Sequence, residues 1–486
     1  MASFGFSKSR ILMGLQCPKR LWLRTHRADL EEFSPQTLAA FSTGHRVGEA
    51  ARGLFPGGVL IEYADNIPAA LAQTKSALRK NNGPLFEAAF SHRRVLVRSD
   101  ILVPSREGPR AIEVKSATSV KDHHLDDCAV QYWVMRGAGI APSTVELAFI
   151  DTEFVYPGSG DYRGLFTFED ITGPVHERAA EVDRWLEEFR ALLSGPMPDI
   201  AVGAQCTTPF ECPFLHFCGR DLPEFPVDIL PRAGALADQL RAEGIDDLRT
   251  IPEGRLVKPL HERIRDATMT GRPYSGPQLI QSLRRLPYPR YYLDFETANL
   301  AVPVWPGTRP YEQLPFQWSC HIERPDGSLD HREFLSISDQ PPMRAFGESL
   351  IATVSGSGPI IVYSSFERTV LRALAARYAD LAADLEKLID RLFDLLPLLQ
   401  QHYYHPEMKG SWSIKSVLPT LAPELAYENL GLIRDGFAAQ QSFEELLQGS
   451  PDPARRDALA HALREYCKHD TLAMRTVVQR LASGSE

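Results

Sequence analysis

The chain has 486 residues, of which 44% are hydrophobic, 24% charged and 9% aromatic, and its formal net charge is −9. This length predicts two or three domains, and the composition is ordinary for a globular protein. No apolar run reaches the roughly 18 residues that span a bilayer, and the N-terminus lacks the apolar core of a secretory signal. We therefore expect a cytoplasmic protein without a membrane partner. The acidic charge argues only weakly against nucleic-acid binding, because it does not fix how charge is distributed over the surface.

The first part of the chain is predicted to be a mixed α/β domain. The segments VLVRSDILV and AIEVKSA indicate two strands joined by the turn PSREGPR, followed by a helix over about 122–137 and the strand VELAFI. Side chains two residues apart on a strand share a face, so Glu113 and Lys115 point the same way. Asp100 can meet them from the paired strand.

These residues suit phosphodiester hydrolysis. Asp100 and Glu113 could bind Mg²⁺ or Mn²⁺ ions, which polarise a phosphate and lower the pKa of an attacking water. Lys115 could orient that water or stabilise charge on the phosphoryl oxygens, and Gln131 lies on the following helix. An exposed hairpin also produces this pattern by chance, so the prediction depends largely on the surrounding sequence.

Four of the seven cysteines form a pattern. Cys206, Cys212 and Cys218 are evenly spaced in QCTTPFECPFLHFCGR, and Cys17 lies upstream in LQCPKRLWL. In a cytoplasmic chain such cysteines suggest metal chemistry rather than disulfides. The other three stand alone and are expected to be plain buried residues: Cys128, Cys320 and Cys467.

Together, these motifs resemble the RecB-like branch of the PD-(D/E)XK nucleases, which includes CRISPR-associated exonucleases and AddB-type nucleases. The resemblance implies a restriction-endonuclease-like domain over 1–225, with Asp100, Glu113 and Lys115 as its core site. It also implies that the four patterned cysteines bind a [4Fe–4S] cluster. Zinc, which prefers tetrahedral thiolates, and free thiols are the alternatives. Where the family often has a metal-binding His this chain has Gly48.

A mostly helical segment, 226–285, follows a Pro-rich passage, CPFLHFCGRDLPEFPVDILPRAG. Its sequence LADQLRAEGIDDLRTIPEGRL resembles a helix–hairpin–helix element, which would grip a nucleic-acid backbone. A plain helical linker fits equally well. The segment ends near RLPYPRYYLDFE, where two prolines precede an apolar strand.

The last part, 286–486, is also predicted to be mixed α/β. YYLDFETA and PIIVYSS indicate strands, and helices are expected near 366–379, 384–403 and 454–482.

Two pairs of residues stand out on these elements. Asp294 and Glu296 flank Phe295 on an apolar strand and share a face, where charges are rare unless they are paired or hold a metal. Tyr466 and Asp470 are four residues apart in EYCKHDTLAM and share a helix face. A strand-end salt bridge and a core aromatic are the plain alternatives.

This pattern resembles the DnaQ-like exonucleases of the RNase H-like fold, in the branch where a tyrosine precedes the last aspartate by four residues. The resemblance implies two-metal hydrolysis at the 3′ end of a strand, with Asp294, Glu296 and Asp470 as metal ligands. Glu367 in YSSFERTVL would be the third acid, with Asp394 as the alternative. WSIKSVLPTL resembles the segment before the family's last helix.

The combined layout resembles an uncharacterised bacterial family that fuses a RecB-like nuclease to an RNase H-like domain. We therefore expect a metal-dependent nuclease with two candidate sites, acting on DNA in preference to RNA. The main alternative is a nucleic-acid-binding or assembly protein in which only the C-terminal domain, or neither domain, is active. A redox-sensing regulator is a further alternative.

Overall fold

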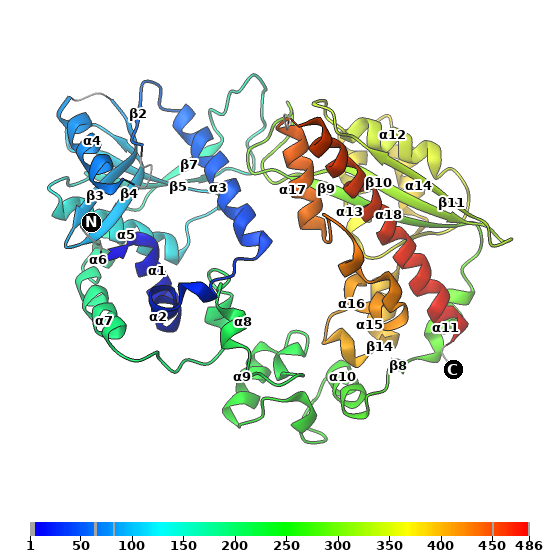
Figure 1. The fold of residues 1–486 in the computed structure, drawn as a ribbon. Helices are drawn as coiled ribbons and strands as arrows, with labels where there is room; N and C mark the ends of the chain where they lie inside the picture. Colours follow the sequence, from blue (N-terminus) through cyan, green and yellow to red (C-terminus); the bar gives the residue numbers. More distant parts are fainter. Residues whose placement is uncertain (1–4, 63–65, 81–82, 450–451, 485–486) are drawn as a thin grey trace. The chain divides into compact units, whose positions relative to one another are not determined.

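In the computed structural model, which describes residues 5–62, 66–80, 83–449 and 452–484, the chain divides into two compact units (Figure 1). Both units combine helices with a β-sheet, which confirms the predicted mixed α/β class. The first unit comprises Met1–Asp221 and Leu300–Glu312, and the second comprises Leu222–Asn299 and Gln313–Glu486.

A mixed sheet forms the centre of the first unit. Its strands pair in the order β2-β3-β4-β5-β6-β7, and β1 pairs with β4. The strands are β1 (Phe6–Ser7), β2 (Val59–Leu60), β3 (Leu85–His92), β4 (Val95–Val103), β5 (Arg110–Lys115), β6 (Thr144–Ile150) and β7 (Phe166–Asp170). β4 is antiparallel to β5, and β5 is parallel to β6. The three strands predicted here, β4, β5 and β6, are confirmed.

The predicted helix over 122–137 is confirmed as α5, which connects the parallel strands β5 and β6. Its buried Val130 and Val134 belong to the same apolar cluster as Val97 of β4 and Leu186 of α7. The helices of this unit are α1 (Lys8–Gln16), α2 (Pro18–His26), α3 (Pro35–Gly53), α4 (Ile67–Lys80), α5 (Asp122–Gly137), α6 (Thr172–Ala179), α7 (Val182–Ser194) and α8 (Leu215–Cys218).

A five-stranded sheet forms the centre of the second unit, in the order β11-β10-β9-β12-β13. The strands are β9 (Arg290–Asn299), β10 (Gln313–Glu323), β11 (Leu329–Leu335), β12 (Ile360–Val362) and β13 (Leu392–Asp394). β9, β10 and β11 are antiparallel, whereas β12 runs parallel to both β9 and β13. A short second pair joins β8 (Tyr274–Ser275) to β14 (Tyr403–Tyr404). The predicted strands β9 and β12 are therefore confirmed.

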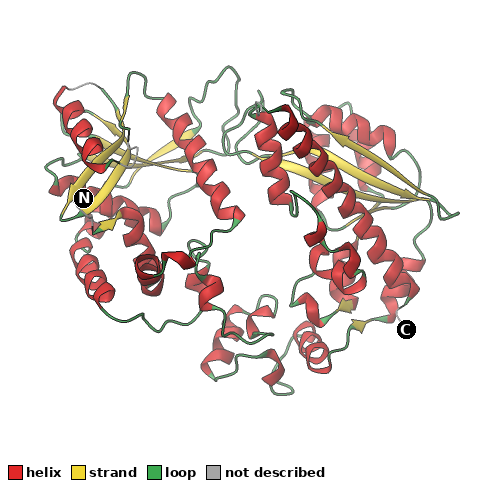
Figure 2. Ribbon diagram, in the orientation of Figure 1, coloured by secondary structure: helices red, strands yellow, loops and turns green. Residues whose placement is uncertain are grey.

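Helices cover the five-stranded sheet, and the longest of them, α18 (Pro453–Ser483), runs along β9 and β10 (Figure 2). The predicted helices near 366–379 and 454–482 are confirmed as α13 and α18. The other helices of the second unit are α9 (Gly234–Ala242), α10 (Pro259–Thr270), α11 (Pro277–Arg284), α12 (Met343–Thr353), α13 (Phe366–Arg377), α14 (Ala382–Ile389), α15 (Leu395–His402), α16 (Ile414–Leu421) and α17 (Gly436–Leu447).

The single helix predicted over 384–403 is wrong. The structure has α14, the strand β13 and then α15 in this stretch. β13 pairs in parallel with β12, with Ile360 opposite Leu392. Leucines recur at helical spacing on both sides of β13, but pairing with a neighbouring strand overrides this local preference.

The predicted middle segment, 226–285, belongs to the second unit. Within the stretch that resembles a helix–hairpin–helix element, α9 is followed by a three-residue 3-10 helix, Leu248–Thr250. The connection between β9 and β10 belongs to the first unit, where Tyr162 donates a hydrogen bond to the Pro303 carbonyl at 3.2 Å. Among the described residues, no helix has both the length and the apolar character of a membrane span.

Packing under β9 provides a test of this fold. Phe346 of α12 is fully buried, and its ring meets Phe295 edge-on with the centroids 4.9 Å apart. We expect Phe346→Ala to destabilise the second unit by about 3–5 kcal/mol, because it leaves a cavity beneath β9. The midpoint of urea unfolding measures this change. As a control, Leu329→Ala removes a 38% exposed side chain and should shift stability by less than about 0.5 kcal/mol. Equal midpoints for the two variants would contradict this packing.

Candidate functional site

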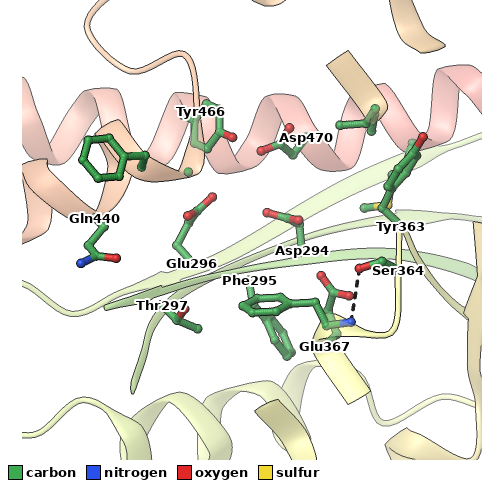
Figure 3. Close-up of a pocket in the computed structure, with 15 residues that line it drawn as sticks. Asp294, Phe295, Glu296, Thr297, Tyr363, Ser364, Glu367, Gln440, Tyr466 and Asp470 are labelled. Atoms are coloured by element: carbon green, nitrogen blue, oxygen red, sulfur yellow. Dashed lines mark hydrogen bonds between the residues drawn. The ribbon is translucent and has the colours of Figure 1, made fainter. Parts of the chain in front are cut away.

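A cavity of about 410 Å³ lies between β9 and α18 in the second unit (Figure 3). Its lining includes all five residues predicted for this site: Asp294, Glu296, Glu367, Tyr466 and Asp470. The alternative third acid, Asp394, is not part of the lining, and its carboxylate lies 3.8 Å from the Arg368 guanidinium. The structure therefore brings Glu367, rather than Asp394, to the cavity.

Strand alternation and helix periodicity explain how these side chains meet. Asp294 and Glu296 point from one face of β9 towards α18, where Tyr466 and Asp470 are one turn apart (Figure 3). Phe295, between the two acids, points to the other face and packs on α12. The same alternation therefore supplies both the acids of the cavity and the core beneath them.

Glu367 reaches the cavity from the first turn of α13, just after β12 ends. Its side chain is 3% exposed, and its Oε2 atom has no hydrogen-bond partner among the described residues. Buried polar atoms are rarely left unpaired in proteins. An unpaired carboxylate oxygen beside three other acids therefore indicates a position where a cation could bind to oxygen atoms of the protein.

In the described part of the chain, none of the four carboxylates is paired with a basic side chain. Across the described residues, no ion pair within 4 Å reaches Asp294, Glu296, Glu367 or Asp470, and only Asp294 is more than slightly exposed. Burial and then repulsion from Asp470 and Glu296 raise the pKa of Asp294 well above its ordinary value. Burial likewise raises the pKa of Glu367 to about 8 and that of Asp470 to about 6. Such a cluster must take up protons or a cation.

Cys467 belongs to this cluster, although its sequence context predicted only a plain buried residue. It is buried, and its Sγ donates a hydrogen bond to Asp294 Oδ2 at 3.4 Å. Ligand atoms of Cys467, Asp294 and Glu296 all lie within 4.8 Å of one another. Burial raises the pKa of the Cys467 thiol well above its ordinary value, so the carboxylates offer the better metal ligands. Its place three residues before Asp470 on α18 was the signal available in the sequence.

Tyr427 and Lys415 also reach this site, although neither was among the predicted site residues. Tyr427 donates a hydrogen bond to Asp470 Oδ1. The Lys415 ammonium lies 5.3 Å from the centroid of the Tyr427 ring and 5.5 Å from that of Tyr466. Burial raises the pKa of Asp470, whereas the Tyr427 hydrogen bond and the Lys415 charge act in the opposite direction. Lys415 belongs to WSIKSVLPTL, the segment singled out earlier for its position in the chain.

The four residues predicted for the first unit also come together. Lys115 Nζ lies 2.6 Å from Glu113 Oε1, and Gln131 donates a hydrogen bond to Glu113 Oε2. Asp100 Oδ2 accepts a hydrogen bond from the Val114 backbone N–H at 2.8 Å. Burial and then repulsion from Glu113 raise the pKa of Asp100 to about 7.

Two further residues complete this site. Asp127 accepts a hydrogen bond from Lys115 at 2.6 Å, and Lys8 lies 3.0 Å from Glu113 and 2.9 Å from Asp127. Asp127 is one helical turn before Gln131 on α5, a spacing that the sequence shows. Lys8 comes from the other end of the unit's sequence, and no local pattern connects it with this site. In contrast to the acids of the second unit, Glu113 and Asp127 form direct ion pairs with lysine side chains.

The four patterned cysteines line one small cavity of the first unit, beside Arg20. None of the four is in a disulfide, and the Cys212 backbone N–H donates a hydrogen bond to the Cys206 carbonyl at 2.8 Å. Burial raises the pKa of the Cys212 thiol to about 11. Cys128 and Cys320 are buried elsewhere, as predicted.

Comparisons with known proteins cover only parts of the chain. A family described as a domain of unknown function (DUF2779) matches residues 291–413, which include β9 and Glu367. The chain is 24% identical over 209 residues to the uncharacterized protein UU173 of Ureaplasma parvum serovar 3, a match that covers 38% of this chain and 30% of that protein. A crystal structure of SSO0001 aligns with 45% of this chain and 87% of its own, at 13% identity and a TM-score of 0.24.

The acids of the second unit predict a specific pH dependence of stability. Because the folded-state pKa values of Glu367 and Asp470 are raised, to about 8 and about 6, the folded chain binds protons more tightly than the unfolded chain. The stability they contribute is present at low pH and is lost as pH rises through these values. With a chelator, the melting temperature should therefore fall between about pH 5 and about pH 9.

Added Mg²⁺ or Mn²⁺ should reduce this fall, because a bound cation replaces the protons. Asp470→Asn should flatten the pH profile of the chelated protein. Asp380→Asn, at an exposed position paired with Arg344, should leave the slope unchanged. A profile of Asp470→Asn that matches the parent would show that these acids are not the cause.

Proposed function

We propose that this protein is a metal-dependent nuclease and that the cavity of the second unit is its principal active site. The observation that supports this proposal best is the set of four carboxylates around one cavity, none of which forms an ion pair among the described residues. Hard oxygen ligands of this kind suit Mg²⁺ and Mn²⁺. Because the acids repel one another, the binding of divalent ions between them is favoured.

Asp294, Glu296 and Asp470 would hold the ions, and the unpaired Oε2 of Glu367 offers a further ligand atom. When bound, two ions activate a water molecule and stabilise the leaving oxygen of a phosphodiester. Burial raises the pKa of Tyr466, so its phenol stays protonated and can donate a hydrogen bond to a water or a phosphate oxygen. The adjacent positive charge of Lys415 favours the anionic backbone of a nucleic acid.

The fold supports an RNase H-like assignment for the second unit. Three antiparallel strands, β11, β10 and β9, are followed in the sheet by the parallel strands β12 and β13. The first acids lie on the central strand β9, and the last helix, α18, carries the tyrosine and the final aspartate. This arrangement is the one expected for a DnaQ-like exonuclease, and we infer trimming of 3′ ends.

For the first unit we propose a PD-(D/E)XK fold with an iron–sulfur cluster bound by the four patterned cysteines. Support comes from the antiparallel pair β4 and β5, which carries Asp100, Glu113 and Lys115, and from the four thiols around one cavity. A tetrahedral zinc site would hold its sulfur atoms within about 4 Å of one another. Among the described residues, no three of these thiols lie within 4.8 Å of one another, so they are farther apart than a tetrahedral zinc site requires.

DNA is the proposed substrate in preference to RNA, because the RecB-like resemblance of the first unit points to DNA. A specific observation also supports the alternative that this unit only binds nucleic acid. Glu113 and Asp127 already form ion pairs with lysine side chains. Their negative charge therefore attracts metal ions less strongly than that of the unpaired acids in the second unit.

A nuclease assay with matched variants tests the principal site. With 5′-labelled single-stranded DNA and Mn²⁺, we expect Asp294→Asn and Glu367→Gln to lose more than about a hundredfold in rate, since even the outer shell of a metal site contributes 10–100-fold. Asp394→Asn, which removes a nearby acid outside the cavity lining, should retain most activity. Glu113→Ala, assayed in parallel, shows whether the first unit also cleaves the DNA.

The outcomes of this assay separate the hypotheses. Loss in Asp294→Asn and Glu367→Gln but not in Glu113→Ala assigns cleavage to the second unit. Loss of different products in the variants of each unit assigns cleavage to both. Wild-type protein that cuts neither DNA nor RNA with Mn²⁺ would reject the nuclease and favour a binding protein.

Purification without oxygen tests the cluster. We expect about four iron atoms and four acid-labile sulfides per chain, with a visible absorption that bleaches on reduction. Cys212→Ser should lose this absorption, whereas Cys128→Ser, at a buried position in α5, should keep it. Colourless protein that carries one zinc ion would refute the cluster.

A further inference from the structure

The acids of the first unit are bridged by two ammonium groups. Lys115 contacts Glu113 Oε1 and Asp127 Oδ2, both at 2.6 Å. Lys8 contacts the same Glu113 oxygen at 3.0 Å and the other Asp127 oxygen at 2.9 Å. Gln131 occupies the remaining Glu113 oxygen. A divalent cation that binds Glu113 Oε1, the oxygen that both lysines contact, must therefore displace a donor of the protein.

Lys8 is the donor that the strand motif does not require. Lys115 shares a face of β5 with Glu113, so its place follows from strand geometry. Lys8 is the first residue of α1 and reaches the site from a separate segment, which the pairing of β1 with β4 and the Ser7 cap hold in place. Only 18% of its side chain is exposed.

This position is unfavourable for a cation without acidic partners. The N-terminus of a helix carries a partial positive charge, and the first turn of α1 contains no acidic residue. Burial lowers the pKa of Lys8, but the charges of Asp127 and Glu113 outweigh it and keep Lys8 protonated. The acids of the site therefore hold Lys8, much as they would hold a metal ion.

We propose that Lys8 is a tethered competitor of divalent metal ions at Glu113 and Asp127. Metal binding in the first unit requires that the Lys8 ammonium leaves these carboxylates, so this unit is held in a metal-poor state by its own N-terminal segment. The inference rests on the proposed metal site of the first unit, but it does not require that the site cuts nucleic acid.

Mn²⁺ binding to the full chain tests the inference. Asp294→Asn and Asp470→Asn first silence the second unit, and free Mn²⁺ is then measured by electron paramagnetic resonance during titration. In this background we expect Lys8→Met to bind Mn²⁺ about tenfold tighter or more, because it removes a positive charge 3.0 Å from a ligand oxygen. Lys75→Met, at an exposed position of α4, removes an equal charge elsewhere and should change nothing.

Two further variants locate the effect. Lys8→Arg keeps the charge and should keep the weak binding of the parent. Glu113→Gln added to Lys8→Met should remove the gain. Lys8→Gln, which loses the charge but keeps a hydrogen-bond donor, gives the same comparison where Lys8→Met does not fold.

A folded Lys8→Met or Lys8→Gln chain that binds Mn²⁺ no tighter than the parent would overturn the inference, and Lys8 would then be only a structural ion pair. Tighter Mn²⁺ binding without cleavage would instead reject nuclease activity in the first unit and leave the competition in place.

Discussion

Repulsion between the acids at β9 and α18 is the constraint on which the second unit depends. Asp294, Glu296, Glu367 and Asp470 meet at one cavity, and burial raises the pKa of each. Desolvation of each charge and its repulsion by the others oppose folding. Apolar packing beneath β9, where Phe295 meets α12, supplies part of the compensation. A stable fold that brings such groups together indicates a ligand that favours their charged forms.

The buried acids of the two units differ in how their negative charge is compensated. In the first unit, lysine side chains neutralise Glu113 and Asp127, and the pKa of Asp127 lies below its ordinary value because Lys115 and Lys8 outweigh its burial. In the second unit, the acids keep raised pKa values and one Glu367 oxygen has no partner among the described residues. A divalent ion thus adds favourable charge in the second unit but competes with existing charge in the first. This difference makes the second unit the better candidate for metal-dependent chemistry.

Local periodicity predicted the parts of each site that lie on one strand or one helix. The alternation of Asp294 and Glu296 on β9 and the spacing of Tyr466 and Asp470 on α18 placed these side chains correctly relative to their own elements. Lys8 and Tyr427 could not be found this way, because tertiary packing brings each to its site from a distant segment. The strand β13 was missed for the same reason, since its pairing with β12 decides its conformation.

The N-terminal helix reaches both of the sites proposed for the first unit. Lys8 is the first residue of α1, and Cys17 caps its last turn at the cavity of the four thiols. A helix of nine residues is about 13 Å long and bends little over that length. The residues at the two ends of this short helix therefore belong to the two sites proposed for the first unit.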